Sequence, residues 1–190
     1  MQYARIDSSY VCGIDLHART MFVCIMDKMG EIVFQRNLKN DFKLLLQVLE
    51  THIDSIAVGV ESTFNWYWLA DGCHKAGIPF YLGHALYMKA IHGGKKKNDR
   101  LDSRMLAELM RCNLFPMAYA YPQEMRATRD LLRRRHRFVA LRAECYTHIQ
   151  NTFSQQAILD PLSDQVKKKS SRRKLCERLA DPDLGMSVDC

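Results

Sequence analysis

Four carboxylates at the ends of predicted elements are the residues of this chain best suited to chemistry. Asp15 ends the apolar run YVCGID, and Glu61 ends the apolar run IAVGVE. Asp99 and Asp102 lie three residues apart in NDRLDSRMLAEL, directly after three lysines. Carboxylates that converge repel one another unless a cation neutralises them, and hard oxygen ligands favour Mg²⁺ or Mn²⁺. The pattern therefore predicts a divalent metal site.

A pair of such ions about 4 Å apart can activate an attacking oxygen and stabilise a leaving oxygen on a phosphodiester. Lys95, Lys96 and Lys97 would then contact the incoming phosphates. Each acid also has a structural explanation, because Asp15 can simply end a strand, and Asp99 with Asp102 suits the start of a helix. The combination of the acids with the order of elements favours the metal site.

The elements that must position these acids follow the order β-β-β-α-β-α-β-α, which is the chain order of a mixed-sheet, ribonuclease-H-like α/β fold. Nearly continuous apolar runs indicate strands that are covered on both faces, and apolar residues at helical spacing indicate the helices. The predicted strands are residues 10–15, 21–27, 31–38, 56–61 and 78–83, and the predicted helices are residues 41–52, 65–77 and 98–111.

The expected sheet brings the acids together. In open α/β sheets the carboxyl ends of the strands are where ligands bind. If the strands ending in Asp15 and Glu61 are neighbours, these two side chains face each other at one edge of the sheet. Asp99 and Asp102, at positions i and i+3, project from one face of their helix. They could close the group from a third side.

A long basic helix is predicted after Pro122. Residues 124–153 contain no proline or glycine, and apolar side chains recur every seven residues from Met125 to Phe153, which is typical of a coiled coil. Residues 126–178 carry a net charge of +9, whereas residues 1–125 carry +1. This asymmetry indicates a nucleic-acid partner, with a solvated basic face as the alternative. The candidate nucleic-acid-binding residues here are Arg126, Arg129, Arg133, Arg134, Arg135, Arg137, Arg142, Lys167, Lys168, Lys169, Arg172 and Arg173.

Composition excludes several classes of protein. With 47% hydrophobic residues, 190 residues can bury one good core. No run approaches the apolar length of a membrane span, and the N-terminus has no signal-peptide layout, so a cytoplasmic protein is expected. The seven cysteines are scattered and form no Cys-x-x-Cys pair, which favours reduced, mostly buried thiols.

Two further signals favour structural roles. His17, two residues after Asp15, could touch a phosphate or a metal, but a lone histidine is usually polar surface. The aromatic cluster Trp66, Tyr67 and Trp68 could stack on bases, yet core packing is the commoner use of such a cluster.

Three stretches of the chain together carry a resemblance to a known family. They are GIDLHART at 13–20, VESTFNWYWLADGCHKAGIPFYLGHALYMKAI at 60–91 and KKKNDRLDSRMLAEL at 95–109. They resemble the N-terminal domain of the insertion-sequence transposases of the DEDD type. The basic stretch LLRRRHRFVALRAECYTHIQNTFSQ resembles the coiled-coil segment of that family, so the resemblance covers roughly residues 10–155.

The resemblance implies a RuvC-like catalytic domain in a DNA recombinase that a bridge RNA guides. It places the catalytic, metal-binding acids of the family on Asp15, Glu61, Asp99 and Asp102. The usual Lys-Thr-Asp before the last acidic pair is Lys97-Asn98-Asp99 here, which keeps the acid and its spacing. The family also has a later domain with a nucleophilic serine, and since the sequence stops at Cys190 we expect a truncated or separated first domain.

The expected organisation has three parts. Residues 1–121 form the RuvC-like domain, residues 122–158 the basic helical segment, and residues 159–190 a polar basic tail that is expected to be flexible. The leading function is a transposase domain that binds Mg²⁺ or Mn²⁺, DNA and a guide RNA. The alternative is a truncated, non-catalytic nucleic-acid-binding protein that dimerises through its helical segment. A sugar-kinase or actin-like ATPase would need a second copy of the domain, for which the chain is too short.

Overall fold

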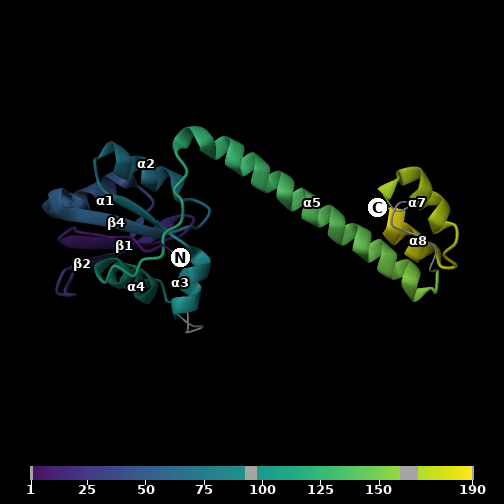
Figure 1. Cartoon of the computed structure of the whole chain (residues 1–190), viewed down its shortest axis with the longest axis horizontal. Coiled ribbons are helices and arrows are strands. Elements are labelled where there is room, and N and C mark those ends of the chain that lie inside the picture. Colours follow the sequence, from purple (N-terminus) through teal and green to yellow (C-terminus); the bar gives the residue numbers. More distant parts are fainter. Residues whose placement is uncertain (1, 93–97, 159–166, 190) are drawn as a thin grey trace. The chain divides into compact units, whose positions relative to one another are not determined.

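The computed structural model describes residues 2–92, 98–158 and 167–189 (Figure 1). Its chain divides into two compact units, Met1–Gln123 and Glu124–Cys190. The three lysines Lys95, Lys96 and Lys97, to which phosphate contacts were assigned, lie outside the described residues.

The first unit is built on a five-stranded mixed sheet. Its strand order is β3-β2-β1-β4-β5, in which β1 is antiparallel to β2 and parallel to β4. β2 and β3 are antiparallel, and β4 and β5 are parallel. This confirms the ribonuclease-H-like mixed sheet. The strands are β1 (Tyr10–Leu16), β2 (Thr20–Asp27), β3 (Ile32–Lys39), β4 (Ile56–Glu61) and β5 (Phe80–Gly83).

Helices cover both faces of the sheet because alternate strand residues point to opposite sides. Cys12, Ile14 and Leu16 of β1 pack into one cluster with residues of α1 (Phe42–Leu49) and α2 (Tyr67–Lys75). On the other face, a second cluster contains Val11 and side chains of α4 (Asp99–Arg111). Figure 1 shows α1 and α2 on one side of the sheet and α4 on the other.

The aromatic cluster after β4 belongs to the core, as the sequence predicts. Trp66 is 2% exposed, and Tyr67 and Trp68 pack against the cluster that it joins.

Glycine in β1 lets α4 lie directly on the sheet. A Cβ atom at Gly13 would lie 2.3 Å from the backbone nitrogen of Ala107 and 2.4 Å from the carbonyl oxygen of Ser103. At Gly59 in the neighbouring β4, a Cβ atom would lie 2.3 Å from Sδ of Met110. No other residue type fits at Gly13 without displacing the helix backbone, so this contact fixes the position of α4 over β1.

Two helical elements of the first unit differ from the sequence pattern. The helix expected at 41–52 is α1 followed by the 3₁₀ helix η1 (Glu50–Ser55). A further helix, α3 (Ala85–His92), follows β5, where the sequence suggested none. Its eight residues lie between Gly83 and Gly93, too short for a helical period to be recognised.

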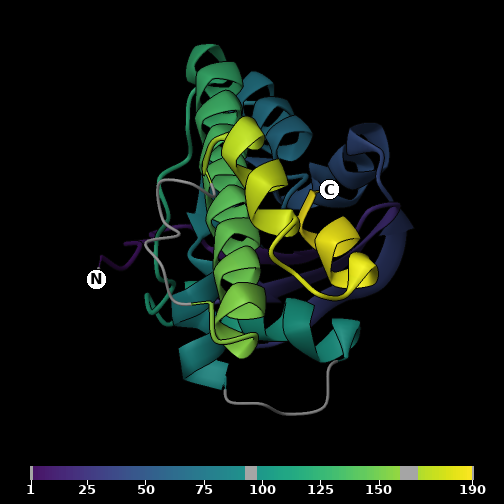
Figure 2. The same cartoon turned by 90° about the vertical axis from the view of Figure 1, so that its right-hand side faces the viewer.

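The second unit begins with the long helix that the sequence predicts. α5 (Gln123–Gln155) is continuous, and its apolar Ile149 and Phe153 are buried near its end. They pack with Leu175, Leu179 and Val188, which come from the region of α7 (Lys169–Cys176) and α8 (Pro182–Asp189). Figure 2 shows these two short helices, in yellow, beside the last turns of α5.

The end of the chain therefore differs from the flexible tail that was expected for residues 159–190. Its described part contains two helices, and the few apolar residues that the polar sequence holds, such as Leu175 and Leu179, form a small core with α5. Composition missed this because the basic residues between them dominate any average. No helix in the described ranges is long and apolar enough to cross a membrane.

The described cysteines are free thiols, and three of them, Cys12, Cys24 and Cys73, are buried, while Cys112 and Cys145 are exposed. Burial raises the pKa of Cys24 to about 11 and that of Cys73 to about 12. The expectation of mostly buried thiols thus holds for the sheet strands and α2, and fails for the end of α4 and for α5.

We predict that Gly13→Ala lowers the free energy of unfolding by about 1–3 kcal/mol, because the added methyl group meets helix backbone that cannot rotate away. Both tryptophans lie in the first unit, so urea unfolding followed by tryptophan fluorescence reports on this unit alone. The control is Gly77→Asn, at a left-handed φ of +69° with open space around it; asparagine tolerates this conformation better than most residues, so the loss of stability should be smaller than for Gly13→Ala. Equal stability of Gly13→Ala and the wild type would contradict the role given to this contact.

Candidate metal centre

Asp15 and Glu61 lie side by side at the carboxyl edge of the sheet. The parallel pairing of β1 with β4 runs to Ile14 and Val60, and each acid is the next residue along its strand. Because strand side chains alternate, Asp15 is on the same face as Gly13, and Glu61 on the same face as Gly59. Both glycines face α4 or the segment after it. The expected adjacency of these two strand ends is therefore present.

Asp99 and Asp102 occupy the first turn of α4. Asn98 caps this helix, with its side chain accepting a hydrogen bond from the backbone N–H of Arg100 at 3.1 Å. The cap fixes where the helix begins and hence where Asp99 stands. Negative charges are stabilised at a helix N-terminus, so this position tolerates two carboxylates in one turn.

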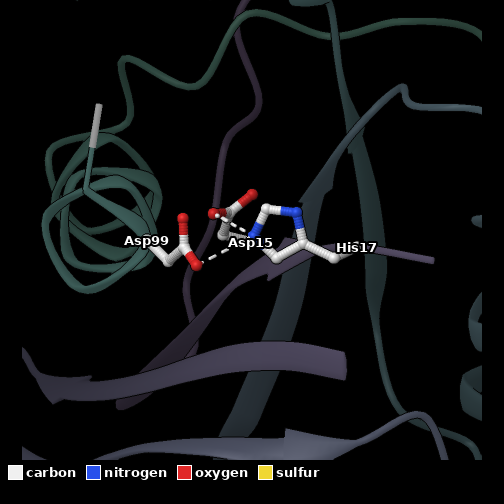
Figure 3. A group of neighbouring side chains, drawn as sticks. All are labelled: Asp15, His17 and Asp99. Carbon is white, nitrogen blue, oxygen red and sulfur yellow. Dashed lines mark ion pairs between the residues drawn. The ribbon is translucent and has the colours of Figure 1, made fainter. Parts of the chain in front are cut away.

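His17 joins the strand acid to the helix acid. Its Nε2 atom lies 3.1 Å from Oδ2 of Asp15 and 3.3 Å from Oδ2 of Asp99. One ligand atom from each of these three residues lies within 4.8 Å of the others. Figure 3 shows the imidazole pointing at both carboxylates. The side chain of Asp15 is 14% exposed and that of Asp99 is 47% exposed, so the group opens to solvent on the helix side.

Of the two readings that the sequence left open for His17, a metal or phosphate contact and ordinary polar surface, the contacts with Asp15 and Asp99 favour the first. The sequence spacing could have indicated this position of His17. Residues two apart on a strand point to the same face, so His17 lies on the face that carries Asp15. Of the four acids proposed from the sequence, the structure brings Asp15 and Asp99 into this compact group. Glu61 and Asp102 stand beside it, at the next strand end and in the same first turn of α4 as Asp99, but outside the 4.8 Å group.

The backbone of His17 is held by side chains from two other segments. Its carbonyl oxygen accepts a hydrogen bond from Nδ2 of Asn65 at 2.6 Å and from Nδ2 of Asn40 at 2.8 Å. Its N–H donates to the carbonyl of Thr20 at 2.9 Å. Asn40 follows β3 and Asn65 follows β4, so the turn that presents the imidazole is tied to the ends of three strands. Sequence reasoning singled out neither asparagine.

The arrangement of donor atoms fits a divalent cation. Oδ2 of Asp15 and Nε2 of His17 are buried atoms that lie 3.1 Å apart. A carboxylate oxygen and a neutral imidazole nitrogen that carries no hydrogen each present a lone pair. A divalent cation could bind to both atoms, and the second carboxylate, on Asp99, adds negative charge to the group. Imidazole among the donors favours Mn²⁺ over Mg²⁺.

The basic residues of the second unit lie mainly on the surface of α5. Arg133, Arg134, Arg135, Arg137 and Arg142 are exposed, as are Lys167, Lys168, Lys169 and Arg173. Arg126 and Arg129 are half-buried, and Arg129 pairs with Asp130 at 2.8 Å. Apolar residues share this surface, with Leu131 68% exposed and Phe138 62% exposed.

Comparison with known proteins identifies the family. The family model of the IS110-type DEDD transposases, described as a transposase, matches residues 12–157. This match covers most of the sheet unit and the whole of α5, and the chain belongs to this transposase family.

Among solved structures, the chain is similar to T. thermophilus RuvC in complex with a Holliday junction substrate. The sequence identity is 16% and the TM-score is 0.39, and the likeness covers 54% of this chain and 90% of that chain. No curated protein matches the chain.

We predict that Mn²⁺ binds to the intact chain and that Asp15→Asn and Asp99→Asn each weaken this binding at least tenfold, because each removes a charged donor from the group around His17. Titration calorimetry measures the affinity. Glu50→Gln, which removes an exposed carboxylate from η1, is the matched control and should bind Mn²⁺ as the wild type does. If all three variants bind alike, the cation is held elsewhere.

Proposed function

We propose that this chain is the catalytic part of a DNA transposase, in which Asp15, Glu61, Asp99 and Asp102 hold Mg²⁺ or Mn²⁺ for DNA strand cleavage and transfer. Membership of a transposase family supports the reaction class. The observation that carries the proposal is the meeting of Asp15 from β1 with Asp99 from α4 at the imidazole of His17.

Each residue has a distinct part in the proposed site. Asp15, the least exposed of the Asp15–His17–Asp99 group, provides a fixed charge on the sheet, and Asp99 provides one on the helix that faces solvent. Glu61, at the end of β4, and Asp102, in the first turn of α4, add two further carboxylates to the proposed metal site. His17 supplies a further donor and holds the two carboxylates at a set separation. A divalent cation bound there would supply the Lewis acidity that phosphodiester cleavage requires.

The basic surface of α5 and the basic residues just before and within α7, namely Lys167, Lys168, Lys169 and Arg173, are proposed to bind nucleic acid. Arginine contacts phosphate oxygens with paired N–H groups, and a helix surface that carries several arginines follows a phosphate backbone. Within the proposal this surface binds DNA and a guide RNA, the latter by analogy with the family that the sequence resembles. Lys95, Lys96, Lys97 and Arg172 are included on their sequence positions.

A second candidate function is a nucleic-acid-binding protein without catalysis that dimerises through α5. Exposed apolar residues on that helix, including Leu131 and Phe138, favour it, since a partner helix could cover them. This candidate predicts that nucleic-acid binding is independent of the acids and that no strand cleavage occurs in Mn²⁺.

We predict that the intact chain nicks DNA in Mn²⁺ and that Asp15→Asn reduces the rate by at least a hundredfold while leaving DNA affinity within about twofold. Gel assays of a labelled duplex measure the rate, and fluorescence anisotropy measures the affinity. His17→Asn should slow the Mn²⁺ reaction more than the Mg²⁺ reaction, because the imidazole is the donor that distinguishes the two ions. Cleavage that persists in Asp15→Asn would remove the site from the mechanism.

We predict that the affinity for DNA falls steeply with salt, because bound arginines release counterions. Replacing Arg133, Arg134 and Arg135 by glutamine should lower the slope of log K against log salt by up to about 2.7, because each phosphate that an arginine neutralises adds about 0.9 to that slope.

The control for this triple variant replaces Arg5, Lys28 and Lys75 by glutamine. These residues are exposed on the sheet unit, and their replacement removes the same charge. An equal reduction in both triple variants would show that binding depends on net charge and not on α5.

A further inference from the structure

Arg100 is an exposed arginine that an uncharged side chain holds in place. Its Nε–H donates a hydrogen bond to Oε1 of Gln35 at 3.1 Å, and its backbone carbonyl oxygen accepts one from Nε2 of Gln35 at 2.8 Å. Both ends of the Gln35 amide therefore bind the same residue. Arg100 lies in the first turn of α4, directly after Asp99, and Gln35 lies on β3, at the edge of the sheet.

The register of the sheet explains why Gln35 reaches this helix. Gln35 lies opposite Cys24 of β2, and Cys24 lies opposite Gly13 of β1. Residues that lie directly opposite one another on antiparallel strands point to the same face of the sheet. Since α4 rests on Gly13, Gln35 points to the face that α4 covers. The first turn of α4 thus contacts both the group around Asp15 and the edge strand.

The positive charge of Arg100 is oriented without being neutralised. The acids that flank it in the first turn do not face it, because residues one and two positions apart lie on different sides of a helix. Within the described ranges Arg100 forms no ion pair, whereas Arg111 at the other end of α4 pairs with Glu108. A glutamine at position 35 occupies Nε and leaves the terminal N–H groups of the guanidinium for another partner.

A DNA phosphate fits these terminal N–H groups. The guanidinium presents paired N–H groups that match two phosphate oxygens, and such charged hydrogen bonds are stronger than neutral ones. Two strand spacings of about 4.8 Å separate β3 from the strand of Asp15. A DNA strand carries one phosphate per about 3.4 Å of helix axis. A strand with one phosphate at the acids therefore brings a neighbouring phosphate within reach of Arg100.

We propose that Arg100, oriented by Gln35, binds a DNA phosphate next to the one that the carboxylates engage. This inference rests on the proposed function, because it takes the acids as the place where a phosphodiester binds. Arg100 is a binding residue, and Gln35 is a positioning residue that acts through it. The contact determines which phosphodiester of the strand lies over the metal site, and neither residue takes part in the bond changes.

The first test measures the affinity of the whole chain for a DNA duplex by fluorescence anisotropy at several salt concentrations. The cation is Ca²⁺, whose coordination is looser than that of Mg²⁺, and a gel checks that the duplex stays intact. Arg100→Gln should weaken binding about tenfold, the effect of one charged hydrogen-bonded contact. It should also lower the slope of log K against log salt by about 0.9, the contribution of one phosphate.

Arg36→Gln is the matched control for the loss of charge. Arg36 is exposed on the same strand as Gln35 and, because strand side chains alternate, on the opposite face of the sheet. Its replacement should have a much smaller effect on both the affinity and the slope. Equal effects of Arg36→Gln and Arg100→Gln would overturn the proposal, because binding would then depend on net charge alone.

A change at Gln35 separates phosphate binding from a purely structural contact. Gln35→Glu keeps a partner for the guanidinium but neutralises it, so the affinity for DNA should fall as it does in Arg100→Gln. Gln47→Glu adds the same charge on the exposed surface of α1, which covers the other face of the sheet, and should bind DNA nearly as the wild type does. If the two glutamate variants bind DNA equally well, the contact only fastens the helix and the proposal fails.

A second test locates the phosphate. An uncharged methylphosphonate replaces one phosphate at successive positions of the duplex. One position should cost the wild type about tenfold in affinity and cost Arg100→Gln nothing. It should lie within about three phosphates of the bond that is cleaved in Mn²⁺. The absence of such a position, or one far from the cleaved bond, would overturn the proposal. A coupled position on DNA that is not cleaved would support Arg100 while the catalytic function fails.

Discussion

The contact of α4 with the backbone of β1 is the constraint on which the rest of the site depends. Only a residue without a side chain allows the helix to lie at the distance that Gly13 permits, where a Cβ atom would stand 2.3 Å from a helix nitrogen. Asp15 is two residues further along the same strand face, and Asp99 is the first residue of the same helix. The close approach at Gly13 therefore sets the distance at which the two acids meet around His17.

A second set of bonds holds the edge of the sheet where the strands end. The carbonyl of His17 accepts hydrogen bonds from Asn40 and Asn65, so the turns after β1, β3 and β4 share one acceptor. These amide–carbonyl bonds hold the backbone of His17, and with it the turn that carries the imidazole, in one position. On the segment of Asn65, hydrogen bonds hold the residues on both sides of Phe64, and the ring of Phe64 stays outside the core.

Much of this architecture was predictable from local patterns. The apolar runs that end in Asp15 and Glu61 became neighbouring parallel strands, and the absence of proline and glycine after Pro122 predicted α5. The patterns failed where a short element depends on distant partners. α3 is too brief to show a period, and α7 and α8 are held by a handful of apolar residues that pack on the end of α5. A short stretch of sequence does not show the distant residues against which these helices pack.

The sequence by itself determined the types of the acidic residues, their positions at strand and helix ends, and the family to which the chain belongs. Hydrophobic periodicity fixes which residues face the core, and an acid that ends a buried strand must lie at the sheet edge. Only the tertiary structure decided that Asp15 and Asp99 meet on an imidazole, while Glu61 and Asp102 stand beside that group. The physical reason is that the distance between a strand and a helix is set by the side chains packed between them, here by their absence at Gly13.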